Sequence, residues 1–269
     1  MAIVKGTFVM TGSFGNASFY TMRGSDKVIV RTKGGASKSK IKNSPQFAAL
    51  RKQQKEWSGC AKFGSVTRYA FGGLHRLADY NITPVLNGIG KKLMKLDAES
   101  EIGKRYLRLS TYKGALEGFN LNRNYPLNTV LRILPGVRLD SDKFEVEIFI
   151  PRINTTIDLL NVQKLPFFRL IVSLGIVSDL AFNADINDYV AIVPQVHGIS
   201  EVQTGKWHST QTIVEAHSIK AAFSPDDIEG NTNEITLLAC LAVEFGNVGF
   251  TGEPVEVKYA GSARVIAVG

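Results

Sequence analysis

The stretch that decides the fold class reads Phe144-Glu145-Val146-Glu147-Ile148-Phe149-Ile150. Its apolar residues alternate with carboxylates up to Phe149, and this two-residue period is typical of a strand with one buried and one solvated face. Further strands are expected after Tyr125 in segments rich in Val, Ile and Phe, at 129–134, 167–177, 189–193, 210–223, 235–245 and 255–268. Turn-forming clusters separate these segments, so we expect residues 125–269 to form an antiparallel β-sandwich.

Before residue 125, apolar residues recur at three- and four-residue spacing, which is typical of amphipathic helices. Ser44 followed by Pro45 is a helix start, because a hydroxyl caps the first turn and proline suits the first helical position. The pair Gly72-Gly73 could bend a helix. We expect a helical domain over residues 44–124, with helices over 44–58, 63–80 and 83–96.

Residues 1–32 are expected to form an arm of three short strands, because alternation is seen in Thr7–Met10, Ser18–Met22 and Lys27–Arg31. Strands this few and short cannot bury an apolar face alone, so the arm must lie on the rest of the protein or on a neighbour. Residues 33–43 combine lysines with glycine and serine, the composition of a flexible linker. That basic linker is either a solvated loop or a tether that contacts acidic groups or phosphates. The fold class expected for the whole chain is α+β.

The two halves of the chain carry opposite charge. Residues 1–124 hold 22 Lys and Arg against 7 Asp and Glu, a net charge of +15, whereas residues 125–269 hold 10 against 17, a net charge of −7. Such a division indicates an anionic partner, or a second copy whose acidic half docks on the basic half. It could also reflect two solvated surfaces.

No motif indicates a reaction. Cys60 and Cys240 lie in different halves without paired spacing, so we expect reduced core thiols and neither a disulfide nor a zinc site. His208 and His217 are close enough along one predicted ribbon to meet, but the histidines lack metal-ligand spacing. Phosphate-binding, dinucleotide-binding and nucleophile-elbow motifs are missing from the sequence. We expect a protein that is not an enzyme, with no catalytic residue, cofactor or metal.

Paired carboxylates occur in turns or at alternating strand positions, where they more often face solvent than act as a glycosidase acid pair. They are Asp140 with Asp142, Glu145 with Glu147, and Asp226 with Asp227. The first residues have neither a basic leader before an apolar run nor a segment of membrane-spanning length. We therefore expect synthesis in the cytoplasm, no signal peptide and no membrane span. Cytoplasm, a phage-like particle and non-classical export all stay open as the final location.

Self-association draws on all of these features, since an arm, a basic linker and an acidic sandwich on one chain suit a homo-oligomer or filament. The residues expected to contact other copies are Phe8, Phe14, Phe19, Tyr20, Lys33, Lys38, Lys40 and Lys42. The alternative partner is nucleic acid, bound without sequence preference. The residues expected to bind it are Arg23, Lys27, Arg31, Arg51, Lys52 and Lys55.

Several turn and cap motifs in the first third of the chain occur together. They are Gly12-Ser13-Phe14-Gly15-Asn16, Phe19-Tyr20, Arg23-Gly24, Val30-Arg31 and Ser44-Pro45-Gln46-Phe47, with Arg51 and Glu56. In these features, over residues 1 to about 100, the chain resembles an uncharacterised family of hypothetical proteins from Bacteroidota. The resemblance implies a bacterial source and the order of glycine-punctuated opening, basic stretch, helical segment and β-rich half. It implies no particular activity, cofactor or site residue.

Overall fold

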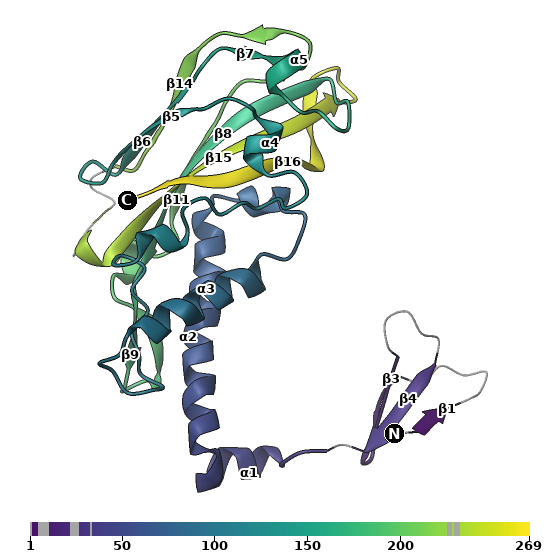
Figure 1. Cartoon of the computed structure of the whole chain (residues 1–269), viewed down its shortest axis with the longest axis vertical. Helices are drawn as coiled ribbons and strands as arrows, with labels where there is room; N and C mark the ends of the chain where they lie inside the picture. The colour runs from purple at the N-terminus through teal and green to yellow at the C-terminus, as the bar shows by residue number, and fades with distance from the viewer. Residues whose placement is uncertain (1, 5–10, 22–26, 33, 225–227, 229–231) are drawn as a thin grey trace. The chain divides into compact units, whose positions relative to one another are not determined.

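The computed structural model describes residues 2–4, 11–21, 27–32, 34–224, 228 and 232–269 (Figure 1). The chain divides into two compact units, Met1–Arg51 and Lys52–Gly269. Helices and antiparallel sheets occur together, which confirms the expected α+β class. None of the helices in the described part of the chain combines the length and apolarity that a membrane crossing needs.

The first unit is built on a four-stranded antiparallel sheet with the strand order β1-β4-β3-β2. The strands at Ala17–Thr21 and Val28–Thr32 fall on two of the three expected strands, while the strand expected at Thr7–Met10 lies outside the described residues. A tight turn at Gly15, whose φ of 53° favours glycine, joins the second strand to the third. The strands are β1 (Ala2–Val4), β2 (Gly12–Phe14), β3 (Ala17–Thr21) and β4 (Val28–Thr32).

A short helix, α1 (Lys38–Asn43), occupies part of the segment expected to be a flexible linker. The Oγ atom of Ser37 caps it by accepting a hydrogen bond from the amide of Lys40 at 3.2 Å. Composition alone indicated mobility, but a serine at the cap position stabilises the first helical turn and overrides it. The 3₁₀ helix η1 (Pro45–Phe47) follows, with Ser44 at the N-cap position and Pro45 in the first turn as expected, but the Ser44 hydroxyl does not make the expected capping hydrogen bond.

Helix α2 (Ala48–Ala70) is one continuous helix where two had been expected, over 44–58 and 63–80. It continues through Gly59 because that residue lies against distant parts of the chain: a Cβ there would sit 2.7 Å from the ring of Tyr189. The helix ends before Gly72 and Gly73, whose φ values of 61° and 77° cannot continue a right-handed helix. The 3₁₀ helix η2 (Leu74–Leu77) takes up the rest, and α3 (Thr83–Leu96) matches the third expected helix.

A five-stranded antiparallel sheet forms the centre of the second unit. Almost every residue of its two central strands is buried, because other layers cover both faces of the sheet. The strand order is β11-β8-β15-β16, with β12 also paired to β8. The bounds are β8 (Phe167–Ser178), β11 (Ser200–Thr204), β12 (His208–Ser209), β15 (Ile235–Val248) and β16 (Pro254–Val268).

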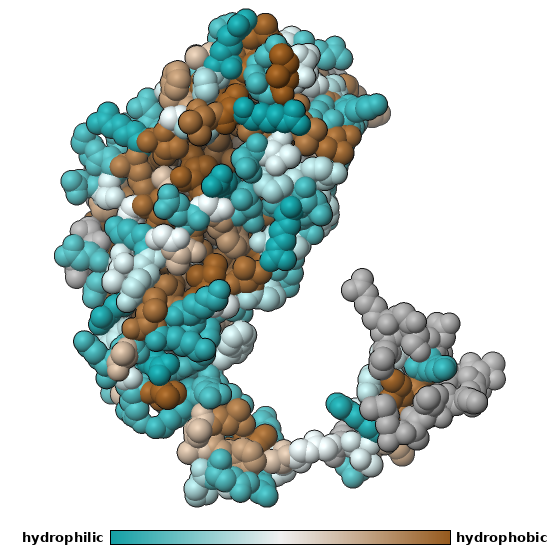
Figure 2. Space-filling view, viewed as in Figure 1, coloured by the Kyte–Doolittle hydropathy of each residue, from teal (hydrophilic) through white to brown (hydrophobic). Residues whose placement is uncertain are grey.

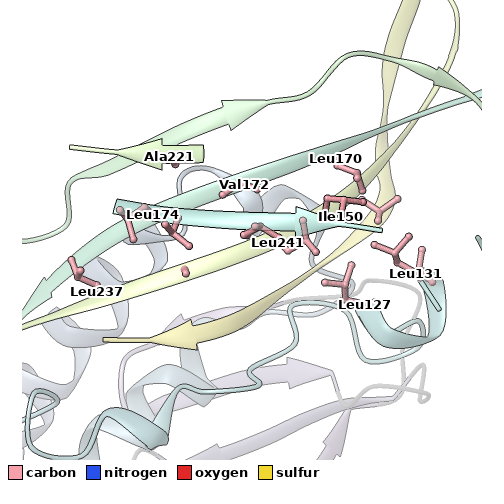
Figure 3. Close-up of a cluster of buried hydrophobic side chains, with 14 of the residues drawn as sticks. Leu127, Leu131, Ile150, Leu170, Val172, Leu174, Ala221, Leu237 and Leu241 are labelled. Atoms are coloured by element: carbon pink, nitrogen blue, oxygen red, sulfur yellow. The ribbon is translucent and has the colours of Figure 1, made fainter. Parts of the chain in front are cut away.

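One face of this sheet packs on a smaller sheet made of β5 (Gly136–Asp140), β6 (Glu145–Ile150) and β14 (His217–Ala222). On β6, Val146, Ile148 and Ile150 are buried while Glu147 and Phe149 are exposed, so the expected alternation is confirmed. The buried side chains join a core with every second residue of β8 and β15 (Figure 3). The two sheets therefore form a sandwich-like arrangement.

The other face of the five-stranded sheet is covered by α2 and α3. Ile171 and Val177 of β8 share a second core with Phe63 of α2 and with Leu86 and Leu93 of α3. This second core contains residues from both sides of the domain boundary expected between residues 124 and 125. The helices and the sheet therefore belong to one compact unit, because each helix buries its apolar stripe on strands that come much later in the sequence.

The remaining elements are short. The strand expected at 129–134 is wrong: Leu127–Val130 is helical, and Leu131 forms only an isolated bridge with Leu159. The strands expected at 167–177, 235–245 and 255–268 correspond to β8, β15 and β16, whereas that at 210–223 is divided between two strands. Other elements are η3 (Lys113–Ala115), α4 (Leu127–Val130), β7 (Ile153–Asn154), α5 (Thr155–Asp158), β9 (Leu180–Asn183), β10 (Asp188–Ala191), η4 (Pro194–Val196), β13 (Ile213–Val214) and η6 (Thr232–Glu234).

Candidate functional site

The edge of the N-terminal sheet carries an aromatic side chain in solvent. Phe14 is 80% exposed at the end of β2, the outermost strand, where it lies opposite Ala17 of β3. An edge strand has unpaired backbone groups on its outer side, which is where another strand can add. Phe14 thus combines an apolar surface with the outer edge of the sheet formed by the described strands.

The described side chains of the same sheet are mostly exposed or half-buried. Phe19 and Tyr20 on β3 are half-buried, and in the described part of residues 1–51 only Val28 and Ile29 are buried. The guanidinium of Arg31 lies 5.5 Å from the centre of the Tyr20 ring. Among the described side chains of this unit, few apolar ones are therefore buried.

Helix α1 presents exposed lysines and has no buried side chain. Lys38, Lys40 and Lys42 are all exposed, and no residue of the helix is buried. Residues two apart on a helix differ by about 200° in direction and residues four apart by about 40°, so Lys38 and Lys42 lie on one side of the helix and Lys40 on the other. Three other residues expected at interfaces, Phe8, Arg23 and Lys33, lie outside the described residues.

Several residues expected to bind nucleic acid make contacts within the chain. Arg51 donates from Nη1 to the carbonyl oxygens of Ile41 and Ser44, both at 2.8 Å, and so holds the corner between α1 and η1. Lys52 pairs with Glu101, and Lys55 donates to Asn187. Among the others, Lys27 and Arg31 are exposed.

One acid of the basic half is buried and paired with basic residues of the same half inside the second unit. The buried carboxylate of Glu56 accepts from Lys91 and from the amide of Gly103, and the Nε atom of Arg105 lies 3.8 Å away. Burial alone would raise the pKa of Glu56, but the bonds from Lys91 and Gly103 outweigh it and lower that pKa. Glu56 is therefore an internal tie between α2, α3 and the segment after α3.

The two histidines expected to meet do so. The rings of His208 on β12 and His217 on β14 lie 6.2 Å apart, beside an open depression of about 580 Å³ that Lys206 and Glu215 also line. Burial lowers the pKa of His208, and the charges of His217 and Lys206 lower it further. Among the described residues no three His, Cys, Asp or Glu side chains gather as metal ligands, and two imidazoles supply fewer ligands than a zinc site needs.

Both cysteines are free and buried, as expected. Burial raises the pKa of the Cys60 thiol to about 11 and that of Cys240 to about 12. The thiolate is the nucleophilic form, so neither side chain is suited to covalent catalysis at neutral pH.

Two apolar surface features of the second unit had not been anticipated. Figure 2 shows hydrophobic side chains in several patches on the visible face. One feature is a groove of about 550 Å³ beside α3, and the other is the hairpin between β15 and β16, where Phe250 is fully exposed. Glycine and asparagine at residues 246–249 predict a turn there, but β15 extends to Val248 and the turn begins at Gly249; such residues do not predict an exposed aromatic beside the turn.

Comparisons of the chain with models of protein families, with curated proteins and with solved structures gave no match.

Proposed function

We propose that the protein is a non-enzymatic structural protein that assembles with copies of itself, into a homo-oligomer or a filament, through the unit Met1–Arg51. The observation that carries the proposal is Phe14, which is 80% exposed on β2, the outer strand of the described sheet. An apolar side chain exposed on an edge strand gains stability when a neighbour covers it. Its open edge is suited to adding a strand from that neighbour.

The distribution of charge also favours a second copy of the chain as the partner. Lys38, Lys40 and Lys42 on α1 are exposed, and residues 125–269 of a second copy would bring a net charge of −7. Basic and acidic surfaces on one chain favour a contact between different patches of two copies, which closes into a ring or continues as a filament.

Sedimentation velocity over a range of protein concentrations tests the proposal. The wild-type chain should form larger species as concentration rises, and the combined variant F14S/K38E/K40E/K42E should associate more weakly. The control K143E/K164E/K206E changes three exposed lysines in the acidic half and should not weaken association. A wild-type chain that stays monomeric at every concentration and ionic strength would refute self-assembly.

Nucleic acid is the second candidate partner, and the exposed lysines of α1 together with Lys27 and Arg31 favour it. Binding that depends on phosphate contacts weakens steeply with salt. Fluorescence anisotropy with a single-stranded oligonucleotide would show a salt slope that falls by about three on changing the three α1 lysines to glutamate. Absence of binding at low salt would exclude this candidate.

A further inference from the structure

The hairpin between β15 and β16 presents apolar side chains at its tip. Phe250 is 109% exposed, and Val248 and Val255 are about half exposed, at 56% and 48%. The tip has a defined turn: the amide of Gly249 donates to the Glu253 carbonyl at 2.8 Å. An ordered turn that carries a phenylalanine in solvent is typical of a contact surface, because isolated turns normally carry polar residues.

A groove elsewhere on the same unit has matching chemistry. Its walls are α3 and the segment around η3, and Leu96 and Tyr112 in it are themselves 52% and 40% exposed. At about 550 Å³ it lies within the range of pockets that enclose small ligands, so it has room for an aromatic side chain. The lining is mainly apolar, formed by Ile89, Lys92, Leu93, Leu96, Tyr112, Gly114 and Ala115.

Charges of opposite sign occur at the two features, with Asp97 after Leu96 as an acidic neighbour of the groove. Lys92 lines the groove, Lys95 lies in the last turn of α3, and Lys113 lies between two lining residues. At the hairpin, Glu253 is exposed and Glu256 has a side chain that is 57% exposed. Apolar surface would therefore meet apolar surface while carboxylates meet ammonium groups.

We propose that the hairpin tip of one copy inserts Phe250 into the α3 groove of a second copy. This inference rests on the proposed self-assembly and names a contact in it that the N-terminal unit does not provide. Tip and groove are different patches of one unit, so the contact is head-to-tail and leaves one tip and one groove open for further copies. Phe250 is its apolar anchor, and Glu253 with Lys92 sets its orientation.

Cysteine cross-linking between full-length chains tests the contact directly. F250C mixed with L96C should give cross-linked pairs under mild oxidation, while a chain with both substitutions should give a ladder of oligomers on a denaturing gel. F250C mixed with I186C is the matched control, because Ile186 is as exposed as Leu96 but lies outside the groove. Cys60 and Cys240 are buried and do not compete.

A charge exchange supplies the second measurement. E253K and K92E should each weaken association in sedimentation velocity, and the double exchange should restore it. F250S should weaken association on the order of 30-fold or more, as loss of an interface anchor does. If the wild type assembles but F250C cross-links to L96C no better than to I186C, the contact is wrong and self-assembly stands. A monomeric wild type would remove both proposals.

Discussion

Glu244 on β15 and Arg169 on β8 lie directly opposite each other in the central sheet, with Oε2 of the carboxylate 2.6 Å from Nη2 of the guanidinium. The carboxylate is almost fully buried, and its other oxygen, Oε1, lies 2.7 Å from Nη2 of Arg76 in η2. The ring of Trp207 lies 4.4 Å from the Arg169 guanidinium. One buried acid thus connects two strands of the sheet to the helical layer.

E244Q should therefore destabilise the fold by about 2–4 kcal/mol, because two guanidinium groups lose their shared counter-charge in a buried place. Urea denaturation at neutral pH measures the change. The control is E256Q: the Glu256 carboxylate lies 3.7 Å from Arg169 but is 57% exposed, so its loss should cost less than about 1 kcal/mol. Equal effects of the two substitutions would contradict the structural role given to Glu244.

The helical layer approaches the sheet most closely at Gly175 of β8. A Cβ there would lie 1.8 Å from the carbonyl oxygen of Ala70, the last residue of α2. G175A should thus destabilise the fold by at least about 3 kcal/mol, because backbone on both sides must move. G88A in α3 is the matched control: a Cβ at Gly88 meets nothing within 4 Å, so alanine should stabilise by about 0.5–1 kcal/mol. Thermal unfolding of both variants should show shifts of opposite sign.

Local pattern in the sequence was sufficient where one element has one buried face. The alternation at β6 and the helix over Thr83–Leu96 were predicted on that basis, and both occur. It was insufficient where burial depends on distant residues: α2 stays helical at Gly59 because Tyr189 packs there. That the helices and the sheet form a single unit could not be predicted for the same reason. Strands β8 and β15 are buried on both faces, and a run of apolar residues does not show which elements cover the second face.

The residues predicted for the interface also divide into those whose exposure was predictable and those whose contacts were not. Phe14 is exposed at a sheet edge, and its place beside a turn between short strands is consistent with that exposure. Arg51 and Lys52, in contrast, were expected to face a partner and instead bind carbonyls and Glu101 within the chain. The pairing of individual charged side chains depends on the tertiary structure, whereas the composition gives only the net charge of a segment.

His197 gives the protein a pH-dependent stability. Its Nδ1 atom accepts a hydrogen bond from the amide of Ser178 at 3.1 Å, and burial lowers its pKa to about 4. In the unfolded chain a histidine has a pKa near 6.5, so below that pH the unfolded state binds a proton that the folded state does not. The stabilising contribution is therefore complete above about pH 6.5 and is lost progressively as pH falls towards 4.

H197Q should remove this dependence, because glutamine keeps a hydrogen-bond acceptor but does not titrate. Between pH 7 and pH 4 the wild-type chain should lose about 2–3 kcal/mol more free energy of unfolding than the variant does. Urea denaturation at pH 7, 6, 5 and 4 measures both curves. H217Q serves as the control, since His217 lies at an open surface depression, and it should keep the wild-type slope. If H197Q instead follows the wild-type curve down to pH 4, the buried neutral imidazole is not the source of the acid sensitivity.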